Sequence, residues 1–153
     1  MAITSYKEIP EIYFLTLTDN IETIFTHGIL SRNNILREKI KFKDCSNPTI
    51  QAVRSMKKIG DLYLHDYANL YFGKRPPMHY NMVYTQKIPQ ETICYICIKN
   101  DVLLTSDMHF TDGHIIYTQT EIYNDLKYLN KLSWNILNDP FFLAKKPDGS
   151  YKS

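Results

Sequence analysis

The chain has 153 residues, of which 44% are hydrophobic and 22% are charged. This length and composition suit one folded domain over residues 1–153 with a true hydrophobic core, and they exclude a disordered tail. The formal net charge is only +2, so the overall charge neither requires nor excludes a nucleic-acid partner.

The first predicted elements are a strand and a short helix. Residues 11–17 have the composition of a strand, since isoleucine, leucine and aromatic residues dominate them. Asp19 precedes Glu22 by three positions, which is the spacing of a capping box, and the helix that follows is expected to end at Gly28. Residues 31–46 carry five basic side chains and are expected to form an exposed loop.

A second helix is predicted to begin near Asn47-Pro48 and to stop at Gly60, because proline is favoured in the first turn of a helix. Ile50 and Val53 would face the core of the domain. Arg54, one position further on, would flank that face.

The remaining elements are mixed in type. Proline at positions 76 and 77 is expected to open a helix over residues 78–84. The pattern then predicts a strand over 91–99, a short piece over 101–106, a strand over 114–120, a helix over 121–137 and a polar loop over 145–153. Short strands and helices without regular alternation indicate an α+β fold, with mixed central sheets and flanking short helices.

Cys94 and Cys97 have the spacing of a metal or redox motif, but they lie in the predicted strand 91–99. Side chains alternate along a strand, so two residues three positions apart point to opposite faces and cannot share one metal ion. Core packing is therefore favoured over a redox or metal role. The odd number of three cysteines does not indicate a disulfide framework.

No stretch approaches the roughly 20 apolar residues that cross a bilayer, and residues 1–8 lack the basic start and apolar run of a signal peptide. We therefore expect a cytoplasmic protein with no membrane association.

Arg54 is the first candidate for a functional residue. A planar guanidinium binds a phosphate through two parallel hydrogen bonds, which a lysine cannot do. The alternative is a solvated arginine on a helix surface, and the residue type alone favours that alternative.

The segment 64–80 is the second candidate. It places the polar side chains of Asp66 and Asn69 among apolar residues, where unpaired burial is costly. Lys74 and Arg75 follow two aromatic residues and precede Tyr80, and such interleaving suits single-stranded nucleic acid. An edge strand with a charged turn explains the same residues equally well.

Other chemistries find little support in the sequence. His65, His79 and His114 match no metal motif, so we expect no bound metal. The serines lack the setting of a hydrolase nucleophile, and no glycine-rich loop of a common nucleotide-binding fold is present.

Several pieces of the sequence, in order, resemble the DarT family of DNA ADP-ribosyltransferase toxins. Residues 12–20 with Ile24 and residues 28–30 resemble the family's opening strand and helix, which hold NAD. Residues 50–54 resemble the helix that carries the family's NAD-contacting arginine. The strongest match is residues 64–80, and residues 110–114 and 132–134 resemble later parts of the family. The resemblance covers roughly positions 10 to 140.

The resemblance implies an ADP-ribosyltransferase fold and an enzyme that uses NAD as co-substrate. Such an enzyme cleaves NAD and transfers ADP-ribose to a base of single-stranded DNA, typically thymine, in a toxin or phage-defence role. A macrodomain antitoxin is the implied partner. The implied residues are the catalytic Arg54, the further NAD-contacting residues Thr16, Asn20, Gly28, Leu30 and Tyr71, and the DNA-contacting residues Lys74, Arg75 and Tyr80.

Two positions depart from the family. Phe14 stands where the family usually has a histidine, so one hydrogen bond to NAD would be missing. The family's catalytic glutamate is expected after the region 145–153, so the chain as given would lack it. This leaves two alternatives open, which are an inactive module that binds NAD or DNA and a transferase that acts on RNA or protein.

Overall fold

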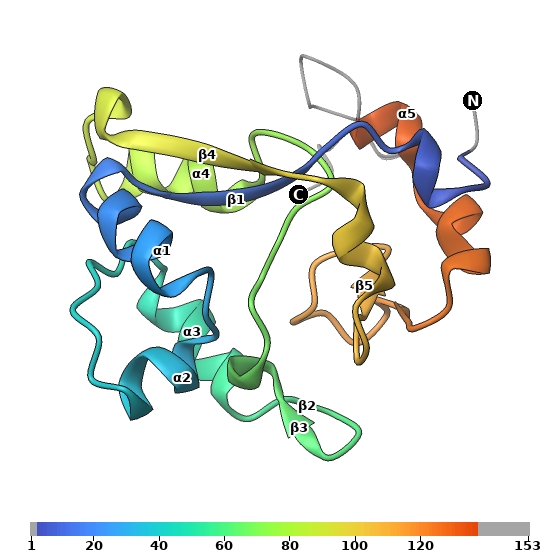
Figure 1. Ribbon diagram of the computed structural model, residues 1–153, viewed down its shortest axis with the longest axis horizontal. Helices are drawn as coiled ribbons and strands as arrows, with labels where there is room; N and C mark the ends of the chain where they lie inside the picture. Colours follow the sequence, from blue (N-terminus) through green and yellow to red (C-terminus); the bar gives the residue numbers. More distant parts are fainter. Residues whose placement is uncertain (1–2, 138–153) are drawn as a thin grey trace. The chain divides into compact units, whose positions relative to one another are not determined.

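The computed structural model describes residues 3–137 as short helices and three two-stranded sheets. The sheets pair β1 (Ile12–Leu17) with β4 (Ile93–Ile98), β2 (Lys58–Ile59) with β3 (Leu62–Tyr63), and β5 (Phe110–Thr111) with β6 (Ile122–Tyr123). β1 and β4 lie side by side (Figure 1). This mixture of elements confirms the predicted α+β class.

The chain forms two compact units, each made of segments that are not continuous in sequence. The first unit contains residues 14–71 and 76–96, and the second contains residues 3–13, 72–75 and 97–137 of the described chain. The prediction of one domain over residues 1–153 stays a prediction, because the described residues end at 137.

The opening of the first unit is close to what the sequence predicts. β1 is a strand, and α1 (Ile21–His27) ends where Gly28 takes a positive φ of 83°. Only glycine adopts that backbone conformation without strain, which explains why the helix stops there. The capping-box prediction is wrong, because no side chain caps α1 and Asp19 instead forms an ion pair of 3.2 Å with Lys43.

The segment 31–46 differs from the exposed loop that the sequence predicts. It contains the helix α2 (Arg32–Arg37), whose first turn is capped by the buried Ser31 through a 3.2 Å hydrogen bond to the Asn34 backbone. Cys45 is buried as well, at 5% exposure. A single cap and a few inward side chains therefore order a segment whose composition is mostly polar.

The helix α3 (Pro48–Ser55) begins as predicted, with Asn47 accepting a 3.0 Å hydrogen bond from the Thr49 backbone. It ends five residues earlier than predicted, because residues 58–63 turn back on themselves as the β2–β3 hairpin and Gly60 lies in the turn at φ 59°. Val53 is exposed rather than core-facing, at 45%.

The predicted helix after the two prolines is present as α4 (Pro77–Tyr80), which continues into a π-helical turn over Asn81–Thr85. Met82 in that turn is fully buried and joins Leu15, Leu17 and Cys45 in the core of the first unit. The strand β4 confirms the predicted strand at 91–99.

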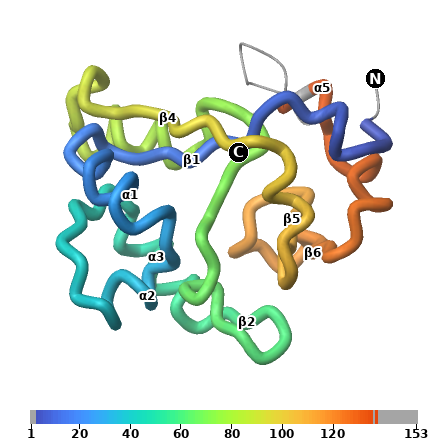
Figure 2. Tube along the Cα trace, in the orientation of Figure 1, coloured from blue at the N-terminus to red at the C-terminus, as the bar shows by residue number. Residues whose placement is uncertain are grey.

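The second unit departs most from the sequence predictions. Residues 114–120 form turns rather than a strand, held by a 2.6 Å hydrogen bond from the Thr120 hydroxyl to the His114 carbonyl. The predicted helix 121–137 is instead β6, a 3₁₀ helix over Leu126–Lys131 and α5 (Trp134–Leu137). Figure 2 traces β5 and β6 side by side, as their register shows. The predicted tail over 145–153 lies outside the described residues.

The second unit also contains 3₁₀ helices over Tyr6–Glu8 and Asn100–Leu104. In the first unit, a 3₁₀ helix over Gln90–Thr92 precedes β4. The Asn100 amide donates a 2.9 Å hydrogen bond to the Ile9 carbonyl, which ties the first two together.

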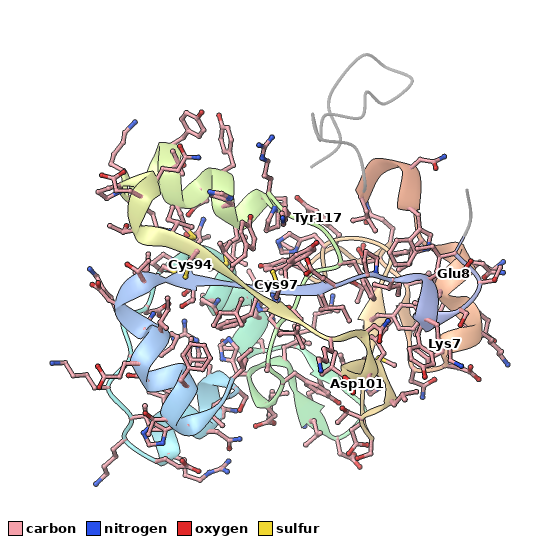
Figure 3. The ribbon with its side chains drawn as sticks, turned by 45° about the horizontal axis from the view of Figure 1, so that its top comes forward. Lys7, Glu8, Cys94, Cys97, Asp101 and Tyr117 are labelled. Carbon is pink, nitrogen blue, oxygen red and sulfur yellow. The ribbon has the colours of Figure 1, made fainter. Side chains whose placement is uncertain are left out.

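All three cysteines are free thiols (Figure 3 labels Cys94 and Cys97 on β4). Cys94 is half-buried and Cys97 is exposed, so the prediction of core packing is wrong for Cys97. Among residues 3–137, no helix is long and apolar enough to cross a membrane.

Candidate functional site

Arg54 is the most unusual charged residue of the first unit. It lies near the end of α3, half-buried, and none of the ion pairs found among residues 3–137 includes it. Burial lowers the pKa of its guanidinium; nearby Tyr71 opposes that shift and Arg32 adds to it. An arginine nevertheless keeps its proton in a protein. A half-buried cation without a carboxylate partner is costly unless a ligand supplies the anion.

Tyr71 lies beside Arg54, and its ring packs against the core of the first unit. Its hydroxyl donates to the sulfur of Met78 at 3.4 Å. Burial raises the pKa of the Tyr71 phenol, whereas Arg54 and a hydrogen bond with Asn69 lower it. The phenol is therefore neutral at ordinary pH and presents a fixed aromatic surface next to the guanidinium.

Four polar side chains hold α3 and α2 against the segment that follows β3, and the sequence analysis singles out only two of them, His65 and Asp66. His65 and Gln51 of α3 share a 2.8 Å hydrogen bond. Asp66 accepts hydrogen bonds of 2.7 Å from the Asn33 amide and 3.0 Å from the Tyr63 backbone. The bond partners are 14 and 33 residues apart, so no local pattern reveals them.

A second arginine lies near Arg54, in the segment that was expected to be an exposed loop. Arg32 donates from one Nη to Asp44 at 2.7 Å and to the Ser46 hydroxyl at 2.8 Å. Desolvation alone would raise the pKa of the Asp44 carboxyl, but hydrogen bonds from Ser46 and from Arg32 outweigh it and lower the pKa. Among the described residues, Arg32 thus has a carboxylate partner and Arg54 has none.

Gly28 and Leu30 line a small hollow in the first unit. Its wall is mostly apolar, and it includes Phe14, the position at which the resemblance expects a histidine. Three residues from the segment 31–46, Ile35, Ile40 and Phe42, complete that wall. The enclosed space is only about 10 Å³, which is about the size of one water molecule, so these residues offer a ligand an apolar surface rather than a closed pocket.

Thr16 and Asn20 are buried, at 1% and 2% exposure, and their side chains bond to the protein itself. The Asn20 amide donates to the Thr16 hydroxyl at 3.2 Å and to the Lys43 carbonyl at 2.8 Å, and it accepts 2.8 Å from the Lys43 backbone. These bonds fix the segment that carries Phe42 to the end of β1. Both residues therefore hold in place the chain next to Phe42, which lines the hollow, and their role in binding NAD stays a prediction.

The three predicted DNA-contacting residues are exposed. Lys74 and Arg75 belong to the second unit, where the Lys74 ammonium lies 5.3 Å from the centre of the Tyr13 ring. Arg75 has a positive φ of 59°. Tyr80 belongs to the first unit and contacts Tyr84.

The first unit contains both a candidate anion site and an apolar hollow. Among residues 3–137 the positive charge of Arg54 has no carboxylate in an ion pair with it, and Tyr71 lies next to it. Within the described chain no group of three or more histidine, cysteine, aspartate or glutamate residues is placed to hold a metal ion. The guanidinium suits a phosphate and the apolar wall suits a flat ring.

Comparison with known proteins shows which family this chain resembles. The sequence model of the family described as "ssDNA thymidine ADP-ribosyltransferase, DarT" matches residues 13–153. A fusion protein of Thermosipho africanus, named as a DNA ADP-ribosyl transferase joined to a DNA ADP-ribosyl glycohydrolase, is 31% identical over 121 residues. The match covers 78% of this chain and 31% of the fusion protein, so the chain spans about a third of that relative.

Two solved structures are similar as well. The structure of Thermosipho africanus DarTG in complex with ADP-ribose has a TM-score of 0.77 and 30% identity, and the match covers 92% of this chain and 37% of that one. The structure of Thermus sp. 2.9 DarT in complex with ADP-ribosylated ssDNA has a TM-score of 0.78 and 26% identity, and the match covers 97% of this chain and 73% of that one. The predicted fold is confirmed by both.

Proposed function

Because the chain belongs to the DarT family of single-stranded DNA thymidine ADP-ribosyltransferases, we propose that it cleaves NAD and transfers ADP-ribose to a thymine base of single-stranded DNA. The observation that carries the proposal is the half-buried guanidinium of Arg54, which has no carboxylate partner among residues 3–137 and lies beside Tyr71. The diphosphate of NAD supplies the missing negative charge.

Arg54 would hold the diphosphate through its planar fork of N–H donors. Charge-assisted hydrogen bonds of this kind are about twice as strong as neutral ones, and the two-point contact also fixes the orientation of the ligand. A bound phosphate also relieves the cost of the buried, unpaired charge. Tyr71, whose ring is packed in place, would shape the ribose side of the site.

The hollow around Gly28 and Leu30 would frame the nicotinamide end of NAD. Nicotinamide carries a positive charge while it is bonded to ribose, and it becomes neutral when the C1′–N bond breaks and nitrogen keeps the electron pair. The mostly apolar wall that Phe14 and Leu30 help to form stabilises the neutral product better than the charged reactant. Thr16 and Asn20 would keep the wall of this hollow in place.

The bond cleavage leaves a positively charged, oxocarbenium-like ribose, as in glycoside chemistry. A thymine nitrogen then forms the new bond to C1′ and loses its proton to a base. The resemblance assigns that base to the family's glutamate, which is expected after the region 145–153, and this expectation stays a prediction. Holding the two reactants in one geometry supplies much of the rate acceleration in such a reaction.

The exposed Lys74, Arg75 and Tyr80 would contact the DNA, with cations on phosphates and a flat ring on a base. We place the reaction in the cytoplasm. A macrodomain antitoxin that removes the modification is the proposed partner, and the transferase–glycohydrolase fusion of Thermosipho africanus supports this pairing.

The test is to incubate the full-length protein with labelled NAD and a panel of acceptors. The panel contains thymine-rich single-stranded DNA, the same DNA with every thymine replaced by cytosine, the matching uracil-containing RNA, and the protein itself. Label on the thymine-containing DNA alone supports the proposal. Label on RNA or protein favours the other acceptor class. NAD binding that Arg54→Ala abolishes, without labelling of any acceptor, identifies an inactive binding module.

A further inference from the structure

Tyr80 and Tyr84 form an exposed aromatic pair on the first unit. Their ring centres lie 4.6 Å apart, and their planes are tilted by 33°. Tyr80 is 66% exposed and Tyr84 is 59% exposed, although the burial of aromatic rings is normally favourable. Each ring therefore presents a flat surface to solvent.

The fold explains how the pair is held in place. α4 and the π-helical turn that follows it carry the two tyrosines four positions apart, so their side chains leave the helix on nearly the same face. Met78 and the fully buried Met82 pack against the core on the inner side. The helix is thus anchored without the tyrosines, whose rings are free for another partner.

The charge of this region suits a polyanion. Within the segment 76–96 of the first unit, no aspartate or glutamate occurs before Glu91, and the segment contains Lys87. Lys87, three residues after Tyr84 in the same unit, is exposed and has a positive φ of 57°. Residues with a side chain rarely adopt that conformation, and asparagine or glycine would fit it with less strain.

We propose that Tyr80 and Tyr84 together form a stacking platform for a nucleobase of single-stranded DNA that flanks the acceptor thymine. The inference rests on the proposed function and adds Tyr84 and Lys87 to Tyr80 as DNA contacts of the first unit. Aromatic rings bind bases of any identity through their flat faces, and an adjacent ammonium neutralises the phosphate. The platform therefore contributes affinity and position rather than sequence choice.

The test measures binding separately from catalysis. A thymine-containing single strand with 2-aminopurine beside the thymine is titrated with protein, and both anisotropy and 2-aminopurine fluorescence are followed. We expect quenching with the native protein, and about 5- to 150-fold weaker binding for Tyr84→Ala or Tyr80→Ala, which corresponds to the loss of one stacked base. Tyr84→Phe keeps the ring and should bind like the native protein. Phe25→Ala removes another exposed ring, at 79%, and is the matched control.

The outcomes separate the platform from the enzyme activity. If DNA binding depends on both tyrosines but no thymine is modified, the platform stands and the proposed function fails. If thymine is modified while Tyr84→Ala binds DNA as tightly as the native protein, the platform is wrong and the tyrosine pair serves only the helix. Tighter binding of RNA than of DNA of the same sequence, or no binding of single strands at all, also overturns the inference. Thermal unfolding of each variant confirms that the fold is kept.

Discussion

The His65 imidazole and the Gln51 side-chain amide share a hydrogen bond of 2.8 Å, which joins the segment after β3 to the helix that carries Arg54. The neighbouring Asp66 makes an equivalent bond to α2 through Asn33. His65 and Asp66 are adjacent in sequence, so their two hydrogen bonds hold α3 and α2 to the same segment. We infer that these two hydrogen bonds set the direction in which the Arg54 side chain points.

The first prediction concerns this positioning. Gln51→Ala removes the acceptor of the His65 bond, and a neutral hydrogen bond contributes about 0.5–1.5 kcal/mol. We expect up to about 12-fold weaker NAD binding, measured by calorimetry, and a melting temperature lower by about 1–6 °C. Ser55→Ala on the same helix is the control, since the Ser55 hydroxyl bonds only within its own turn. Equal losses in both variants would show a general effect on α3 rather than positioning.

The second prediction concerns the pH dependence of stability. Burial lowers the pKa of His65 below its ordinary value of 6.5, and the charges of Arg32 and Arg54 lower it further. The folded state therefore resists protonation, whereas the unfolded state accepts a proton below pH 6.5. Stability should be fully present above pH 6.5 and should fall as the pH drops through the lowered pKa.

Two measurements check this prediction. His65→Gln keeps a donor for Gln51 but cannot titrate, so its denaturant midpoint should vary less between pH 7 and pH 5 than that of the native protein. Inorganic pyrophosphate should raise the pKa of His65 in an NMR titration, because it neutralises the arginine charges. An unchanged His65 pKa with pyrophosphate bound would place the anion elsewhere.

The third prediction concerns Asn20, which we expect to act through the structure. Asn20→Ala leaves the Lys43 backbone groups without their partners, and a buried unpaired group costs about 1–3 kcal/mol. The free energy of unfolding, measured with urea, should fall by about that amount. Asp19→Ala breaks an exposed ion pair to the same lysine and should change stability by under about 1 kcal/mol. A loss of NAD binding without any loss of stability would instead make Asn20 a direct contact.

The fourth prediction separates function from stability at Arg54. Arg54→Met keeps much of the side-chain volume but removes a half-buried charge that has no carboxylate partner among the described residues. We expect NAD binding to weaken by at least 10-fold while the melting temperature stays the same or rises. Arg32→Met, which breaks the bond to Asp44, should lower the melting temperature. A clear drop in stability for Arg54→Met would assign this arginine to the fold.

The elements that the sequence predicts well are those decided by neighbouring residues. β1 follows from its composition, α1 ends because Gly28 has a positive φ, and α3 begins at the Asn47 cap followed by proline. Each of these signals acts within a few positions. The resemblance also identifies the family, because it depends on the order of several pieces rather than on one motif.

The errors arise where distant residues decide the structure. The predicted helix over 121–137 has apolar residues at helical spacing, but Ile122–Tyr123 pairs with Phe110–Thr111 as a hairpin. Likewise the loop prediction for residues 31–46 missed the bonds from Asn20 to Lys43 and from Arg32 to Asp44. The hydrogen bonds of His65 and Asp66 join residues that are 14 and 33 positions apart, and no local pattern reveals such pairs.

The most direct test of the proposed function is tandem mass spectrometry of a single-stranded oligonucleotide with one thymine, after incubation with NAD and the full-length protein. We expect the fragment containing this thymine to gain one ADP-ribose, and we expect the folded Arg54→Ala variant to produce no such gain. An unmodified thymine, or a gain that persists at full rate in Arg54→Ala, would contradict it.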